Sequence, residues 1–155
     1  MSQIIKGEFN ITLDERNRIK LPVDLKRMLP NEAKGLVLTR RLSDHGCLNL
    51  YPQVVWNAEH DELRSKLNLK RKDHQEYYDY FMDGVCDFEL DNADRFVIPK
   101  ALLEALSSDK ELIIRGMGDH ITIWSKAEWE KRRVKKSDRF KKLNDDLAEL
   151  FDKLS

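Results

Sequence analysis

One ten-residue phrase occurs twice in this chain, and the repetition restricts the fold more than any other feature of the sequence. The first copy, LDERNRIKLP, occupies residues 13–22, and the second, LDNADRFVIP, occupies residues 90–99, at an offset of 77 positions. Both copies begin with Leu-Asp, place an arginine four positions after the aspartate and end in proline. A phrase of this length that occurs twice indicates a duplicated unit.

The match extends into the segments that follow the phrase. Leu36 in GLVLTRRL corresponds to Leu112 in ELIIRGMG, and Tyr51 corresponds to Trp124, so the offset falls from 77 to 73. The change lies between strand-like segments, where loops tolerate differences in length. Two copies are too few for a solenoid and predict a pseudo-symmetric pair. The expected order is a first unit, a connecting helix, a second unit and a basic, then amphipathic C-terminal helix, at residues 5–68, 69–85, 86–130 and 131–155.

Each unit has the same predicted order of elements: a strand, a tight turn, a second strand, a short helix and two more strands. Asn17 and Asp94 end the two turns at positions where glycine would be the easiest choice, and both residue types tolerate positive φ. Pro22 and Pro99 end the second strands, because proline donates no ladder hydrogen bond. The predicted class is therefore α+β.

Apolar residues three and four positions apart predict further helices at 53–68 and 70–83 and one long helix from Lys126 almost to the end of the chain. Ser125 is expected to cap that last helix, and Glu128 completes a capping box. The stretch KRRVKKSDRFKK within it has eight basic residues against one aspartate. The apolar residues that follow are expected to pack on the barrel or on a neighbouring subunit.

The doubled Asp-x-x-x-Arg phrase, the stretch GLVLTRRL followed by CLNLYP, and the stretch GMGDHITIWSKAEWE together resemble the MraZ family, over roughly residues 5–133. The resemblance implies tandem AbrB-like swapped-hairpin β-barrel units that form an intramolecular pseudo-dimer. It also implies a ring-shaped homo-oligomer that regulates transcription as a repressor. Such a ring would bind short repeated G-rich boxes in double-stranded DNA upstream of the division and cell-wall gene cluster, which includes its own gene.

The chain departs from the family pattern just before each motif arginine, where family members commonly carry glycine. Asp94 adds a negative charge beside Arg95, which weakens the case for DNA contact by the second copy. The counts agree: residues 14–27 hold five basic and three acidic residues, whereas residues 91–104 hold two and three. The first copy is therefore expected to be the better anion-binding surface.

The second strand of the first copy carries the candidate DNA contacts. Strand alternation is expected to place Arg16, Arg18 and Lys20 on one side. Arginine can pair with guanine in the major groove, whereas Lys20 and Lys26 are expected to meet phosphates. Arg95 is a weaker candidate from the second copy. The aspartates are expected to bond the turn backbone and orient the arginines, which gives a structural turn set of Asp14, Asn17, Asp91 and Asp94.

The formal net charge is zero, so the surface is not uniformly basic, and a single subunit is expected to bind DNA weakly. A ring that presents several hairpins at once would raise the effective affinity without new kinds of contact. Oligomerisation would therefore be physically useful as well as implied by the resemblance.

The sequence predicts neither an enzyme nor a metal site. Its four histidines are scattered, and Cys47 and Cys86 lack metal-ligand spacing, so no cofactor and no small-molecule substrate are expected. The stretches DHGC and GMGDH lie in corresponding loops and are weak candidates for acid–base or ligand groups. An AbrB-fold antitoxin-like protein, or a scaffold, that acts mainly through a protein partner remains the alternative.

The sequence also bears on where the protein acts. The N-terminal stretch MSQIIKGEFN lacks a basic segment followed by an apolar run, and no window of about 18 apolar residues occurs. We therefore expect a cytoplasmic, nucleoid-associated protein with no membrane partner.

Overall fold

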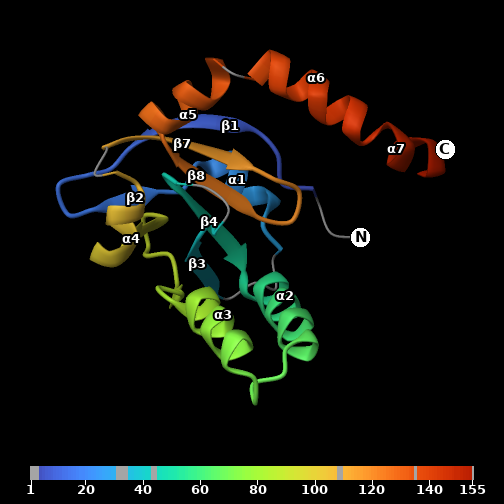
Figure 1. Ribbon diagram of the computed structural model, residues 1–155. Helices are drawn as coiled ribbons and strands as arrows, with labels where there is room; N and C mark the ends of the chain where they lie inside the picture. The colour runs from blue at the N-terminus through green and yellow to red at the C-terminus, as the bar shows by residue number, and fades with distance from the viewer. Residues whose placement is uncertain (1–3, 31–34, 43–44, 108–109, 135, 155) are drawn as a thin grey trace.

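The computed structural model describes residues 4–30, 35–42, 45–107, 110–134 and 136–154 (Figure 1). Its strands are β1 (Glu8–Thr12), β2 (Arg18–Lys20), β3 (Leu36–Arg40), β4 (Cys47–Pro52), β5 (Cys86–Phe88), β6 (Arg95–Val97), β7 (Glu111–Gly116) and β8 (Ile121–Ser125). Its helices are α1 (Val23–Met28), α2 (Gln53–Lys66), α3 (Lys72–Met82), α4 (Lys100–Ala105), α5 (Lys126–Val134), α6 (Lys136–Asp146) and α7 (Ala148–Leu154). The fold is α+β.

Six strands form one antiparallel sheet in the order β1-β7-β8-β4-β3-β5, and both halves of the chain contribute to it. The first strand of each half pairs with the third strand of the other half. Ile11 lies opposite Leu112 in the β1–β7 pair, and Phe88 lies opposite Leu36 in the β5–β3 pair. In the repeat, Ile11 corresponds to Phe88 and Leu112 corresponds to Leu36. The register of strand pairing is therefore the same in the two pairs.

One face of the sheet covers the main hydrophobic core. Along β7, Leu112 and Ile114 point into this core, together with Ile19 from β2 and Phe96 from β6. The remaining pair of strands, β2 and β6, is therefore packed on this face of the sheet. Burial of these large apolar side chains is the main favourable contribution to the fold.

The other face of the sheet carries a second, smaller cluster under α5. It contains Cys47, Ile113, Trp124 and Trp129. The α5 helix begins directly after β8, and the N–H of Glu128 donates a hydrogen bond of 3.3 Å to Ser125 Oγ. This bond confirms the predicted cap.

The expected single C-terminal helix is wrong: the segment forms α5, α6 and α7, and α6 and α7 extend from the body of the molecule (Figure 1). Within the described residues, the interruption is a turn at Leu147 between α6 and α7. Lys135 lies outside the described residues. Much of the apolar face of α6 and α7 does not pack on the sheet, and Phe140 is 65% exposed.

The two helices between the halves match their predicted ranges closely. They form a pair in which Trp56 of α2 stacks on Phe81 of α3 at 6.2 Å between ring centroids. Within the described residues, no helix is long and apolar enough to cross a bilayer.

Candidate nucleic-acid interface

The strands β2 and β6 form an antiparallel ribbon to which each half of the chain contributes one strand. Ile19 lies opposite Phe96 at its centre, and both side chains are buried in the core. Residues directly opposite one another share a face, and neighbours along a strand face opposite ways. The flanking pairs therefore face away from the core: Arg18 with Val97, and Lys20 with Arg95.

We call this outward surface of Arg18, Lys20, Arg95 and Val97 the ribbon face. Lys20 and Val97 are exposed, whereas the two arginines are half-buried. The face carries three positive charges, of which Arg18 and Arg95 form ion pairs with aspartates of the adjoining turns. It combines side chains from both copies of the repeat, which the separate charge count of each copy did not anticipate.

In the first copy, Asp14 organises the turn and holds the arginine that follows it. Its Oδ1 accepts hydrogen bonds from the backbone N–H groups of Arg16 and Arg18, at 2.8 and 2.9 Å. Its Oδ2 accepts a bond of 2.7 Å from Arg18 Nε. The aspartate thus bonds the turn backbone with one oxygen and the guanidinium with the other.

The second copy repeats the same geometry. Asp91 Oδ1 accepts hydrogen bonds from the N–H groups of Ala93 and Arg95, at 2.8 and 2.9 Å, and Oδ2 accepts a bond of 3.1 Å from Arg95 Nε. The two arginines are therefore oriented by matching aspartates on one surface.

Asn17 and Asp94 adopt the left-handed conformation, with φ of 60° and 62°. Each also ties its turn to the opposite copy. The carbonyl of Asp94 accepts a hydrogen bond of 2.9 Å from the N–H of Leu21, and the carbonyl of Asn17 accepts one of 2.9 Å from the N–H of Ile98. Each turn is thus held by hydrogen bonds within the turn and by one backbone hydrogen bond from the other copy.

Two candidates lie differently from expectation. Arg16 lies in the turn before β2, so strand alternation does not place it on the ribbon face. The left-handed residue Asn17 separates it from the strand. Lys26 forms an ion pair of 2.5 Å with Asp94, so a phosphate would have to compete with that carboxylate. The same pair offsets the charge of Asp94 beside Arg95.

The hydrogen bonds to the turn aspartates also change their acidity. The backbone N–H of Arg18 is the main cause that lowers the pKa of Asp14, and the N–H of Arg95 does the same for Asp91. Because the native state holds these carboxylates ionised more strongly than the unfolded state does, their contribution to stability is present at neutral pH. It is lost as the pH falls below about 4.

We therefore expect the free energy of unfolding of Asp14→Asn to depend less on pH in the acidic range than that of the original chain. The variant should be less stable than the original chain at pH 7, and the difference should shrink as the pH falls from about 5 to 3. Urea unfolding at fixed protein concentration measures this. The exposed Glu15→Gln in the same turn is the control and should follow the original chain. A constant difference across that range would contradict the assignment.

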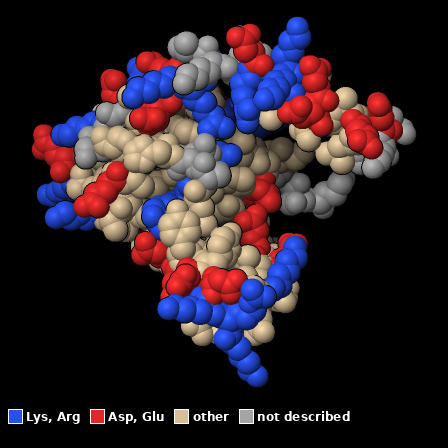
Figure 2. Space-filling view, in the orientation of Figure 1, with Lys and Arg blue, Asp and Glu red and all other residues tan. Residues whose placement is uncertain are grey.

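The surface as a whole mixes charges of both signs. Figure 2 shows Lys and Arg side chains interspersed with Asp and Glu over the visible face, in keeping with a formal net charge of zero. Among the described residues, no three His, Cys, Asp or Glu side chains are grouped to hold a metal ion.

Sequence reasoning missed Val97 and the pairing of the ribbon. Val97 corresponds to Lys20 in the repeat, so the outward face has a valine where strict symmetry would place a fourth cation. The repeat alignment already contained this difference. Only the pairing of β2 with β6 shows that this difference lies on the outward face of the ribbon, and this pairing joins residues far apart in the chain.

Comparison with known proteins identifies relatives of this chain. A family model described as "MraZ protein, putative antitoxin-like" matches residues 81–150. A protein of Clostridium beijerinckii named transcriptional regulator MraZ is 36% identical over 123 residues, which cover 79% of this chain and 82% of the relative. One of Phocaeicola vulgatus with the same name is 32% identical over 139 residues, or 90% of each chain. The chain belongs to the MraZ family.

Proposed function

We propose that this chain is a transcriptional regulator that binds double-stranded DNA through the ribbon face. The observation that carries the proposal is the pair of arginines, Arg18 and Arg95, each held by its own aspartate on one outward surface with Lys20. The name shared by the relatives supports the same function.

The geometry suits direct reading of bases. The major groove admits a two-stranded β-ribbon, and arginine can pair with guanine O6 and N7 through two donors. Asp14 and Asp91 bond the Nε atoms of Arg18 and Arg95, which leaves the terminal nitrogens of both guanidinium groups to make such a pair. The aspartates fix the side chains in advance and so reduce the entropy lost on binding. Lys20 would meet phosphate.

At the level of the fold, the proposal includes tandem AbrB-like units with exchanged hairpins. Its support is the pairing of β1 with β7, of β5 with β3 and of β2 with β6, each of which joins one half of the chain to the other. In this arrangement neither half has a complete sheet of its own.

At the level of regulation, the proposal is a ring-shaped oligomer that represses its own gene cluster by binding repeated G-rich boxes. The protein would act in the cytoplasm at the nucleoid. The three cations of one ribbon face give weak attraction on their own, and several faces on one ring would act together.

Fluorescence anisotropy tests the function. We expect DNA from upstream of the gene to bind more tightly than a scrambled duplex of equal length. The logarithm of the affinity should fall with the logarithm of salt concentration with a slope of roughly −0.9 for each engaged subunit, since Lys20 is the ribbon cation that meets phosphate. Equal affinity for both duplexes would exclude sequence-specific regulation.

A second candidate function is action mainly through a protein partner. The exposed apolar side chains of α6 and α7, including Phe140, Leu150 and Phe151, favour it. It predicts a stoichiometric complex with a defined partner and DNA binding that does not depend on Arg18. The anisotropy experiment with an Arg18→Ala variant separates the two functions.

A further inference from the structure

A cavity of about 600 Å³ lies on the side of the sheet away from the ribbon. Along β7, Leu112 and Ile114 point into the main core beneath the ribbon, whereas Ile113 belongs to the second cluster on the opposite face. Arg115 points to that same opposite face by strand alternation and lines the cavity. Any ligand of this cavity would therefore leave the ribbon face free.

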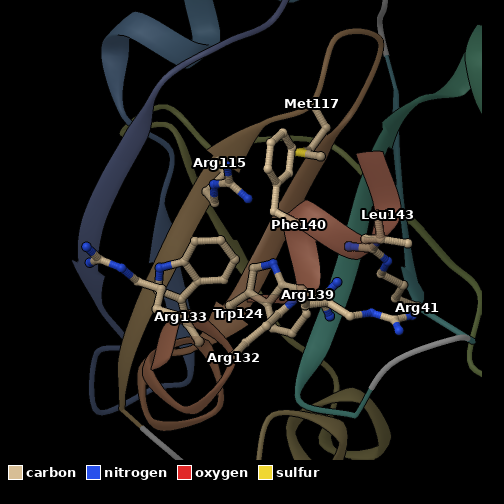
Figure 3. A pocket seen from close by; sticks show the side chains of 10 residues that line it. Arg41, Arg115, Met117, Trp124, Arg132, Arg133, Arg139, Phe140 and Leu143 are labelled. Carbon is tan, nitrogen blue, oxygen red and sulfur yellow. The ribbon is translucent and has the colours of Figure 1, made fainter. Parts of the chain in front are cut away.

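The wall of the cavity is strongly cationic. Side chains from β7, α5 and α6 converge on it, and Figure 3 shows several of its arginines together. Its arginines are Arg41, Arg115, Arg132, Arg133 and Arg139, and none of the described residues that line it is acidic. Arg115 also forms an ion pair of 3.1 Å with Glu8, which offsets one of the five charges.

Two tryptophans give the cavity flat aromatic walls. The guanidinium of Arg115 lies 4.4 Å from the ring centroid of Trp129, and that of Arg132 lies 4.9 Å from the ring centroid of Trp124. Trp124 and Trp129 are only 2% and 6% exposed. Their Nε1 donors have no hydrogen-bond partner among the described residues. Buried donors without an acceptor cost free energy.

In the first copy of the repeat the corresponding cavity has fewer arginines in its wall, Arg40 and Arg41, and includes the acidic Glu59. Glu59 stands where the second copy has Arg132, and Thr39 stands where it has Arg115. The corresponding cavity is lined by both residues, and burial and then the Glu59 carboxylate raise the pKa of Tyr51 within it. Four of the five arginines in the wall follow Gly84 in the chain, and Arg41 comes from the first copy, so the repeated architecture alone does not produce this wall.

We propose that the Arg115–Arg132–Trp124 cavity binds a nucleoside phosphate. The arginines supply planar, charged donors for phosphate oxygens. The indole and guanidinium planes, together with Met117 and Phe140, suit a flat base. The volume lies within the range of about 300–1,000 Å³ that holds small organic ligands. The inference is independent of DNA binding by the ribbon.

Isothermal titration calorimetry of the full chain with ATP, GTP and inorganic tripolyphosphate tests the proposal. We expect at least one nucleotide to bind several-fold more tightly than tripolyphosphate. Arg132→Gln and Arg139→Gln, which change different helices, should each weaken nucleotide binding about tenfold, because a hydrogen bond to a charged group is lost. Lys131→Gln removes the same charge from α5 outside the cavity and should stay within about twofold.

Several results would overturn the proposal. No heat of binding with either nucleotide, or equal affinity for tripolyphosphate, would exclude a nucleotide site. An equal loss in Lys131→Gln would show general attraction of anions. Displacement of bound nucleotide by a short DNA duplex would assign the cavity to nucleic acid. A change in molar mass by light scattering for Arg132→Gln without nucleotide would assign it to a contact between subunits.

Discussion

Alanine at both Arg18 and Arg95 is expected to lower the affinity for upstream DNA by at least about 30-fold. Two bidentate contacts to guanine are lost, and each contributes roughly 1–3 kcal/mol of discrimination. The preference over a scrambled duplex should disappear with them. Each arginine lies on the outward side of the ribbon, so the fold should be retained. Fluorescence anisotropy at fixed salt measures the loss, and circular dichroism checks the fold.

Two further variants make this result specific. Arg64→Ala removes an exposed arginine from α2, outside the ribbon, and should leave the affinity within about twofold. Val97→Lys adds the missing fourth cation and should raise affinity for upstream and scrambled DNA alike, with a steeper salt dependence. A double variant that still prefers upstream DNA would remove the ribbon from the mechanism. Loss in Arg18→Ala alone would assign reading of bases to the first copy.

Phe96→Ala is expected to lower the free energy of unfolding by about 3–5 kcal/mol, the usual cost of deleting a buried phenylalanine side chain. Phe96 is 4% exposed, lies opposite Ile19 and stacks on Phe88 at 4.5 Å between ring centroids. The substitution would leave a cavity beneath the ribbon, where both halves of the chain meet. Urea unfolding at one protein concentration measures the change.

Val97→Ala is the matched control for this experiment. Val97 is the next residue on the same strand but is 56% exposed, so the loss should stay within about 0.5 kcal/mol. Equal losses for Phe96→Ala and Val97→Ala would mean that the ribbon does not pack on the core as described. They would also weaken the assignment of an outward face.

Local features of the fold could be predicted from sequence because short-range chemistry determines them. Asn17 and Asp94 adopt positive φ where the turn requires it, and Ser125 caps α5. The ribbon could not be predicted in this way, since Ile19 and Phe96 are joined only by tertiary packing. The same applies to the ion pair between Lys26 and Asp94, which joins the two copies.

The C-terminal segment shows a different limit. Its apolar spacing indicated one helix, and this spacing continues through Leu147, where a turn separates α6 from α7. Trp129 anchors α5 on the sheet, while Phe140 of α6 remains exposed. The apolar periodicity correctly predicted that this segment is helical, but it did not predict where the helix is interrupted.

The two strands of the ribbon present different side chains, and this difference affects the symmetry of the DNA site that the ribbon would bind. Two identical hairpins related by a two-fold axis would favour a palindromic site. Here one strand presents Arg18 and Lys20 and the other presents Arg95 and Val97, so a bound duplex meets unlike ends. Each subunit would therefore have a direction along the double helix, and on the ring proposed above neighbouring boxes would be direct repeats.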